Sequence, residues 1–189
     1  MADDDQWDSF PLASHPLDAY LGGALSGQGP AFEAAGRQFG VDPTLLAAIA
    51  TLESGHGTSR ATRAYNNPTG MMDPKNPMQF QRFGSIPEAI NATARDLSEN
   101  YLQQGLSTIA QIGAKYSPPD AANDPKGTNA QWPSQVQKLY NSMGGTQTTF
   151  GPQQVGPAVA IMGGYNEPKA NWDAFPLATA NQPQASAAQ

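Results

Sequence analysis

The residue with the clearest chemical potential in this sequence is Glu53, an acid that follows nine uncharged residues in the pattern of a helix. Leu46, Ile49 and Ala50 precede it at helical spacing, so Glu53 continues an apolar face. Burial and the negative end of a helix both favour the protonated form of a carboxyl group. Such a group can act as a general acid near neutral pH. The alternative is a glutamate on the solvent side of a frayed last turn.

The element that must position Glu53 is a predicted helix. Asp42 is a suitable N-cap, and Pro43 suits the first helical turn. Gly55 and Gly57 follow Glu53 at the point where the helix has to end. Two apolar stripes overlap on this helix, so we expect it to lie inside the molecule.

The residues after Glu53 resemble those of a known family. The run E-S-G-x-G-x-S starts at Glu53 and is followed by Asn66-Asn67-Pro68-Thr69-Gly70. This arrangement resembles the glucosaminidase family of peptidoglycan hydrolases, within the lysozyme and lytic transglycosylase superfamily. The resemblance covers residues 30–145 and is strongest over residues 47–72. It implies a mainly α, lysozyme-like domain with a small β-hairpin or irregular lobe, and an enzyme that acts on peptidoglycan as a glycoside hydrolase or lytic transglycosylase.

The same resemblance implies the roles of individual residues. Glu53 corresponds to the catalytic acid, and the turn at residues 66–70 corresponds to the cleft wall that faces it. Tyr116 and Trp132 would flank the glycan groove, although both are also explained as aromatic core residues at helix ends. Tyr65 would either stack on a sugar or cap the core. The expected substrate-binding residues are Ser54, Tyr65, Asn67, Gly70, Met71, Tyr116 and Trp132.

A second catalytic carboxylate is harder to assign, although most glycosidases use two. Asp73 is the acid in the stretch where the glucosaminidase family places its second carboxylate, but Pro74 follows it and a turn role is the alternative. Glu88 follows Ser85 at capping-box spacing, which gives it a structural role. If Glu53 is the only catalytic acid, a sugar hydroxyl or the 2-acetamido oxygen of the substrate would attack the anomeric carbon. Glu53 would then act first as acid and afterwards as base.

The rest of the central segment is predicted to be mostly helical. Apolar periodicity indicates further helices, the last of them capped by Asn129, over residues 31–39, 86–101, 106–116 and 129–143. Alternating apolar and polar residues at 78–83 indicate a short strand.

Composition excludes several kinds of function. The net charge is -6, and residues 30–145 hold nine basic and nine acidic side chains, so nucleic-acid binding is not expected. The chain has no cysteine and two histidines without an HExxH pattern, so we expect no metal and no other cofactor. No apolar run is long enough to span a bilayer, and the acidic N-terminus does not resemble a secretory signal.

Composition also divides the chain into three predicted regions. Residues 1–29 are expected to form an N-terminal arm that ends in a Gly/Ser-rich linker, and residues 30–145 the hydrolase domain. Residues 146–189 are expected to form an extended, low-complexity C-terminal arm without a core.

Both arms carry the same short motif. Residues 6–14 read QWDSFPLAS and residues 171–179 read NWDAFPLAT, with six identical positions. An apolar anchor of this kind is suited to a pocket on another protein, and two copies would raise avidity for a repetitive partner. The expected docking residues are Trp7, Phe10, Pro11, Trp172, Phe175 and Pro176. The alternative is that the two copies pack on the domain or on each other.

These features predict an enzyme that a phage particle carries to aid wall penetration and genome ejection. Its partners would be peptidoglycan and, through the WDxFPLA motifs, a tail, portal or ejection protein. It would be located in the virion and act in the host periplasm or cell wall. Two alternatives remain open: a catalytically silent lysozyme-like adaptor or glycan-binding protein, and a bacterial glucosaminidase of envelope machinery.

Overall fold

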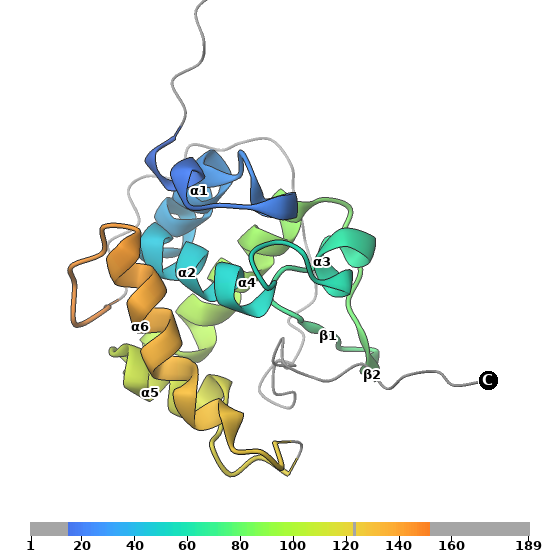
Figure 1. Cartoon of the computed structure of the whole chain (residues 1–189), viewed down its shortest axis with the longest axis vertical. Helices are drawn as coiled ribbons and strands as arrows, with labels where there is room; N and C mark the ends of the chain where they lie inside the picture. The colour runs from blue at the N-terminus through green and yellow to red at the C-terminus, as the bar shows by residue number, and fades with distance from the viewer. Residues whose placement is uncertain (1–14, 123, 152–189) are drawn as a thin grey trace, which may run out of the picture.

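The computed structural model describes residues 15–122 and 124–151. Helices pack around a central helix, α2, and a small hairpin lies at one side (Figure 1). The helices are α1 (Gly29–Phe39), α2 (Pro43–Glu53), α3 (Arg60–Tyr65), α4 (Ile86–Asn100), α5 (Ile109–Tyr116) and α6 (Trp132–Ser142), and the strands are β1 (Met72–Asp73) and β2 (Asn76–Phe80). The predicted mainly helical fold with a small hairpin lobe is confirmed. None of the helices in these ranges is both long and apolar enough to cross a bilayer.

The N-terminus of α2 forms as its sequence predicts. The carboxylate of Asp42 accepts hydrogen bonds from the backbone N–H groups of Thr44 at 2.8 Å and Leu45 at 2.9 Å. These are donors that the helix itself leaves without partners. Pro43 occupies the first turn, where its missing N–H costs nothing. Local interactions therefore fix where the helix begins.

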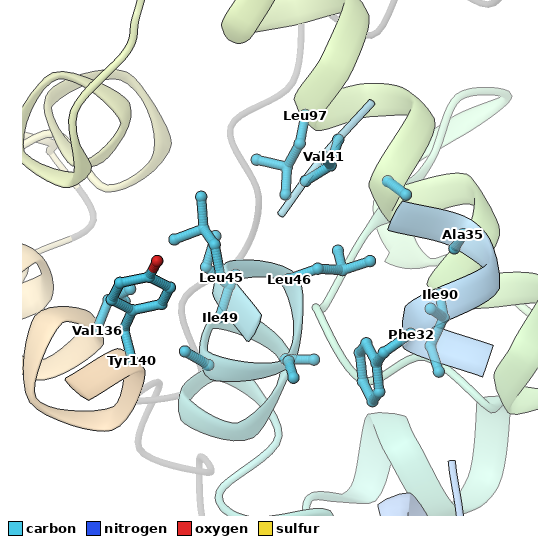
Figure 2. Close-up of a cluster of buried hydrophobic side chains, with 14 of the residues drawn as sticks. Phe32, Ala35, Val41, Leu45, Leu46, Ile49, Ile90, Leu97, Val136 and Tyr140 are labelled. Carbon is cyan, nitrogen blue, oxygen red and sulfur yellow. The ribbon is translucent and has the colours of Figure 1, made fainter. Parts of the chain in front are cut away.

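The core surrounds α2, as predicted from its apolar stripes. Leu45 and Ile49 face α6, where they lie near Val136 and Tyr140 (Figure 2). On the other side, Leu46 points toward the side chains of α1 and α4 (Figure 2). The three α2 side chains expose 1% of their surface or less, so each contributes about 1.5–3 kcal/mol through burial. This packing fixes the direction in which α2 delivers its last residue, Glu53.

The hairpin pairs β1 with β2 in antiparallel register, with Met72 opposite Phe80 and Asp73 opposite Asn76. Strand β2 begins at Asn76, two residues before the predicted range of 78–83, and ends at Phe80. Past Phe80 the N–H of Gln81 still donates to the carbonyl of Met71 at 2.8 Å, and the N–H of Phe83 donates to the carbonyl of Tyr65 at 2.9 Å. The hairpin is thereby tied to the end of α3.

Residues 15–29 are not the linker that their composition predicts. Leu17, Leu21 and Leu25 are buried in the main core, and two short 3-10 helices, Pro16–Ala19 and Gly23–Leu25, carry them there. The N–H of Ala24 donates to the carbonyl of Gly57 at 3.1 Å. The glycine and serine content masked a regular spacing of leucines, and burial of those leucines outweighs the flexibility of their neighbours.

The core also continues past the predicted boundary at residue 145. Phe150 exposes 2% of its surface and packs edge-on against Tyr140, with ring centroids 5.3 Å apart. The prediction of a C-terminal arm without core residues is therefore wrong for residues 146–151. Both copies of the WDxFPLA motif lie outside the described residues.

The start of α6 also differs from prediction. Asn129 does not cap this helix, because a 3-10 turn, Thr128–Gln131, precedes Trp132. The side chain of Asn129 instead donates to the carbonyl of Pro118 at 2.9 Å. Its backbone N–H donates to the Asp124 carboxylate at 2.6 Å. These two bonds close the loop between α5 and α6.

Candidate active site

Glu53 is the last residue of α2 and exposes 4% of its surface. The indole Nε1–H of Trp132 donates a hydrogen bond to Glu53 Oε1 at 2.6 Å. Trp132 is the first residue of α6, so the contact joins the end of one helix to the start of another, 79 residues later. This burial excludes the alternative of a solvent-facing glutamate on a frayed turn.

The indole that holds Glu53 is part of an aromatic cluster. The ring of Tyr116, at the end of α5, stacks on Trp132 with centroids 4.9 Å apart and an interplanar angle of 29°. The ring of Tyr101 lies 6.0 Å from that of Tyr116. Gly113 provides room for the indole, because a Cβ there would come within 2.8 Å of Trp132 Cε3. Glycine at this position lets α5 and the Trp132 ring approach closely.

The hydroxyl of Tyr116 is the notable polar group of this cluster. Tyr116 exposes 1% of its surface, and its hydroxyl has no hydrogen-bond partner among the described residues. Burial, followed by the charges of Glu53, Tyr101 and Asp96, raises the pKa of Tyr116 well above its usual value near 10. The side chain is therefore a neutral phenol at neutral pH, with an O–H able to donate to a ligand.

Two residues of this cluster, Asp96 and Tyr101, were not predicted as site residues. Asp96 lies near the end of α4 and Tyr101 directly follows that helix, and both are buried, with 7% and 6% of their surface exposed. Asp96 accepts a hydrogen bond of 2.8 Å from Asn100, and the Lys115 ammonium lies 5.0 Å from the ring centroid of Tyr101. No sequence pattern connects either residue to the site, because Tyr116, through which they meet it, belongs to another helix, α5.

The loop after Glu53 is braced by Ser54. This residue is fully buried, and its hydroxyl oxygen accepts a hydrogen bond of 2.8 Å from the N–H of Gly57. Gly57 has a φ of 78° and lies against the backbone of Gly22 and Ala24. The described contacts of Ser54 thus hold the shape of the loop, and a contact with substrate stays a prediction.

The Asn66–Asn67 turn joins α3 to the hairpin. Asn67 is fully buried, and its amide nitrogen donates to the carbonyls of Met71 at 2.8 Å and Gln81 at 2.9 Å. Its amide oxygen accepts from the N–H of Met71 at 2.9 Å. Gly70 completes the turn with a φ of 69°. These bonds give Asn67 a bracing role, and its predicted contact with substrate is not tested by them.

The remaining predicted binding residues lie in the same lobe. Met71 exposes 1% of its surface and packs with Phe83 in a small second core. Tyr65 is half-buried, and the guanidinium of Arg82 lies 4.1 Å from its ring centroid. Any sugar that stacks on this face of Tyr65 would have to displace Arg82. The structure therefore brings Tyr116 and Trp132 to Glu53, while Tyr65 and Met71 belong to the lobe formed by α3 and the hairpin.

Comparison with known proteins identifies the family. The sequence matches the Glucosaminidase family, described as mannosyl-glycoprotein endo-beta-N-acetylglucosaminidase, over residues 29–145, which is more than half of the chain. The chain belongs to the glucosaminidase family. The protein is therefore a glycoside hydrolase by family, and its matched region contains Glu53, Tyr116 and Trp132. No curated protein matches the sequence.

Solved structures show that this glucosaminidase shares its fold with autolysins. S. aureus autolysin E superimposes with a TM-score of 0.54 and 19% identity, over 70% of this chain and 66% of the other. A catalytic mutant of autolysin E in complex with the disaccharide NAG-NAM superimposes with a TM-score of 0.53 and 18% identity, over 70% and 67%. The chain thus spans about two thirds of the length of autolysin E, and at these identities the likeness concerns the fold.

The two candidates for a second carboxylate in this glucosaminidase lie outside the aromatic cluster. Asp73 is in the hairpin, where its carboxylate accepts a hydrogen bond of 2.8 Å from the N–H of Lys75. Glu88 is half-buried, and its carboxylate accepts from the N–H of Gly84 at 2.9 Å, while its own N–H donates to the Ser85 hydroxyl. The predicted Ser85 cap forms, but the Glu88 carboxylate bonds Gly84 and not the N–H of Ser85, so the capping box is only half formed. A catalytic role for Asp73 stays a prediction. Within the described ranges, no group of three His, Asp or Glu side chains is placed to hold a metal ion.

Proposed function

We propose that this glucosaminidase cleaves peptidoglycan glycan strands at a β-1,4 bond between amino sugars, with Glu53 as the general acid. One observation carries the proposal: Glu53 is buried at the end of α2 and is held at 2.6 Å by the Trp132 indole. Burial away from water favours the protonated form of a carboxyl group, which is the form that a general acid needs. The solved complexes of autolysin E with a muropeptide and with NAG-NAM support peptidoglycan as the substrate class.

The reaction follows from the chemistry of one buried acid. The bond between the anomeric carbon and the glycosidic oxygen breaks, and its electron pair goes to that oxygen, which takes the proton of Glu53. Positive charge develops at the anomeric carbon while Glu53 becomes a carboxylate. A water molecule or a sugar hydroxyl then adds to that carbon, directly or after attack by the 2-acetamido oxygen, and returns a proton to Glu53.

Tyr116 supports this proposal through its unpartnered hydroxyl. A buried hydroxyl without a partner costs about 1–3 kcal/mol, and a substrate acceptor would remove that cost. Because Tyr116 stays neutral, it can donate to a sugar oxygen or to the acetamido carbonyl throughout the working pH range. We therefore assign Tyr116 to substrate binding beside Glu53.

The test is turbidity loss and zymography on purified cell walls with native protein and Glu53→Gln. Removal of a general acid is expected to lower the rate about 100- to 10,000-fold. Glu99→Gln is the matched control, because Glu99 is exposed and its carboxylate is not part of the site. Equal activity of native protein and Glu53→Gln would overturn the assignment, and an inactive native protein would favour the adaptor function.

The products distinguish the routes that remain open. Mass spectrometry of the released sugars would show a 1,6-anhydro end if a sugar hydroxyl attacks, and a reducing end if water attacks. A reducing muramic acid and a reducing glucosamine identify the two possible bonds. A product with a reducing glucosamine would match the chemistry in the family's description.

We further propose that the enzyme is carried in a phage particle and binds another virion protein through its two WDxFPLA motifs. The sequence repeat supports this, since six of nine residues recur in two segments that lie outside the family match. The expected partner is a tail, portal or ejection protein with an apolar pocket. Copurification with virion proteins should be lost in the double variant Trp7→Ala plus Trp172→Ala. Undiminished association would contradict docking, and genome neighbours from envelope machinery would favour the bacterial alternative.

A further inference from the structure

The indole of Trp132 is fixed on three sides. Its ring stacks on Tyr116, and its edge lies where any side chain larger than a hydrogen atom at Gly113 would collide with it. Gly113 and Tyr116 are three residues apart on α5, so the two contacts come from one face of that helix. The third contact is the hydrogen bond of 2.6 Å from the indole nitrogen to Glu53 Oε1. The indole is therefore held before any substrate binds.

The backbone before Trp132 is also fixed. The Asp124 carboxylate accepts hydrogen bonds from the N–H and the hydroxyl of Thr128 at 2.9 and 2.8 Å, and from the N–H of Asn129 at 2.6 Å. Asn129 in turn ties the loop to Pro118. These bonds set the 3-10 turn that leads directly into Trp132. A donor placed in this way needs no rearrangement when charge develops on its partner.

We propose that Trp132 is a positioning residue that anchors Oε1 of Glu53 and thereby assigns the transferable proton to Oε2. The inference rests on the proposed role of Glu53 as general acid. An indole N–H can only donate, so the oxygen that it meets must accept. In a protonated carboxyl group the accepting oxygen is the carbonyl oxygen, and the hydroxyl proton is then on the other oxygen.

The same bond acts after the proton has left. When Glu53 gives its proton to the glycosidic oxygen it becomes a carboxylate, and the bond from Trp132 becomes charge-assisted and stronger. The indole therefore stabilises the product of proton transfer more than the starting acid. Trp132 acts through Glu53 and needs no contact with the sugar, which separates this role from the predicted substrate contact.

Other titratable groups lie near this pair and could also affect the protonation of Glu53. Tyr116 on α5 interacts electrostatically with Glu53, and also with Asp96 on α4 and with Tyr101, the residue after α4. Lys115 lies beside Tyr101. Variants at Trp132 and Gly113 leave all four groups in the protein. A change in the pH profile of those variants therefore reports the indole bond.

The kinetic test compares Trp132→Phe, which keeps a ring but removes the donor, with Gly113→Ala, which keeps the donor but displaces the ring. For Trp132→Phe we expect kcat to fall roughly 10- to 100-fold, KM to change less than about twofold, and the alkaline limb of kcat/KM to move up by about one pH unit. Gly113→Ala should shift the same limb in the same direction. Tyr20→Phe, at an exposed site, is the control. A raised KM with an unchanged limb would overturn the proposal and make Trp132 a substrate contact.

A second measurement does not depend on glycan cleavage. The indole N–H resonance of Trp132, identified by its loss in Trp132→Phe, should move with pH in the native protein and stay constant in Glu53→Gln. Such a titration in a protein that cuts no glycan would retain the positioning role and refute the proposed function. A resonance that does not respond to Glu53 would refute the positioning role, whatever the activity.

Discussion

The side-chain amide of Gln147 donates a hydrogen bond of 3.1 Å to the carboxylate of Asp42, the residue that caps α2. The hydroxyl of Tyr140 donates to the same carboxylate oxygen at 3.3 Å. Gln147 lies beyond the family match, which ends at residue 145. At the opposite end of α2, Ala24 is bonded to Gly57 and also lies outside the matched range. Two segments outside the family domain therefore hold both ends of the helix that carries Glu53.

Truncation of Phe150 should destabilise the whole domain. Phe150→Ala removes a ring that is 98% buried against Tyr140, and a change of this kind typically costs about 3–5 kcal/mol. Urea unfolding followed by circular dichroism measures the loss. Met78→Ala is the control, because Met78 exposes 88% of its surface and should change stability by less than about 0.5 kcal/mol. Equal stability of the two variants would show that residues 146–151 do not contribute to the core.

Gly57 and Gly27 form a matched pair for the N-terminal segment. Both have positive φ, 78° and 73°, so alanine at either position carries a backbone cost of about 1–2 kcal/mol. A Cβ on Gly57 would also overlap the carbonyl of Gly22, whereas one on Gly27 meets nothing within 4 Å in the described chain. We expect Gly57→Ala to be clearly less stable than Gly27→Ala and to lose activity, since Gly57 belongs to the loop after Glu53. Similar melting temperatures and rates for the pair would contradict this.

Tyr116→Phe should separate activity from stability. The hydroxyl has no partner among the described residues, so its removal should leave the free energy of unfolding unchanged or raise it by up to about 1 kcal/mol. Activity on glycan strands should nevertheless fall about tenfold or more, because the proposed donor to substrate is lost. Steady-state kinetics and urea unfolding on the same preparations measure both effects. A destabilised but fully active variant would assign the hydroxyl a structural role.

Asp124 should make the loop before Trp132 sensitive to acid. The hydrogen bonds from the N–H of Asn129 and from Thr128 lower the pKa of Asp124 below its ordinary value near 3.8. Its stabilising contribution is therefore complete above that value and is lost as pH falls through the lower, folded-state pKa. The melting temperatures of native protein and Asp124→Ala should differ at pH 6, and the difference should shrink as pH falls below 3.8 and vanish below the lowered folded-state pKa. A difference that persists unchanged at low pH would rule out this carboxylate as the cause.

The sequence determined the features that depend on near neighbours. The Asp42 cap, Pro43 and the apolar stripes predict α2 and place Glu53 at its end, because a cap and a helical face involve residues a few positions apart. The Ser85 cap of α4 was predicted for the same reason, because its hydroxyl accepts from the N–H of Glu88, three residues later. The other half of the predicted capping box is absent, since the Glu88 carboxylate bonds Gly84. The existence of α2 and the position of Glu53 at its buried end were therefore predictable from the sequence.

Tertiary structure decided what the predicted faces touch. The periodicity of apolar residues predicts that Trp132 and Tyr116 point inward. It does not predict that Trp132 donates a hydrogen bond to Glu53 or that Tyr116 stacks on Trp132. The same limit applies to Asp96, which acts on Tyr116 from another helix, and to Leu25 and Phe150, which composition placed in arms. A contact across 79 residues depends on how whole helices pack, and packing is set by the shape of the core and not by local sequence.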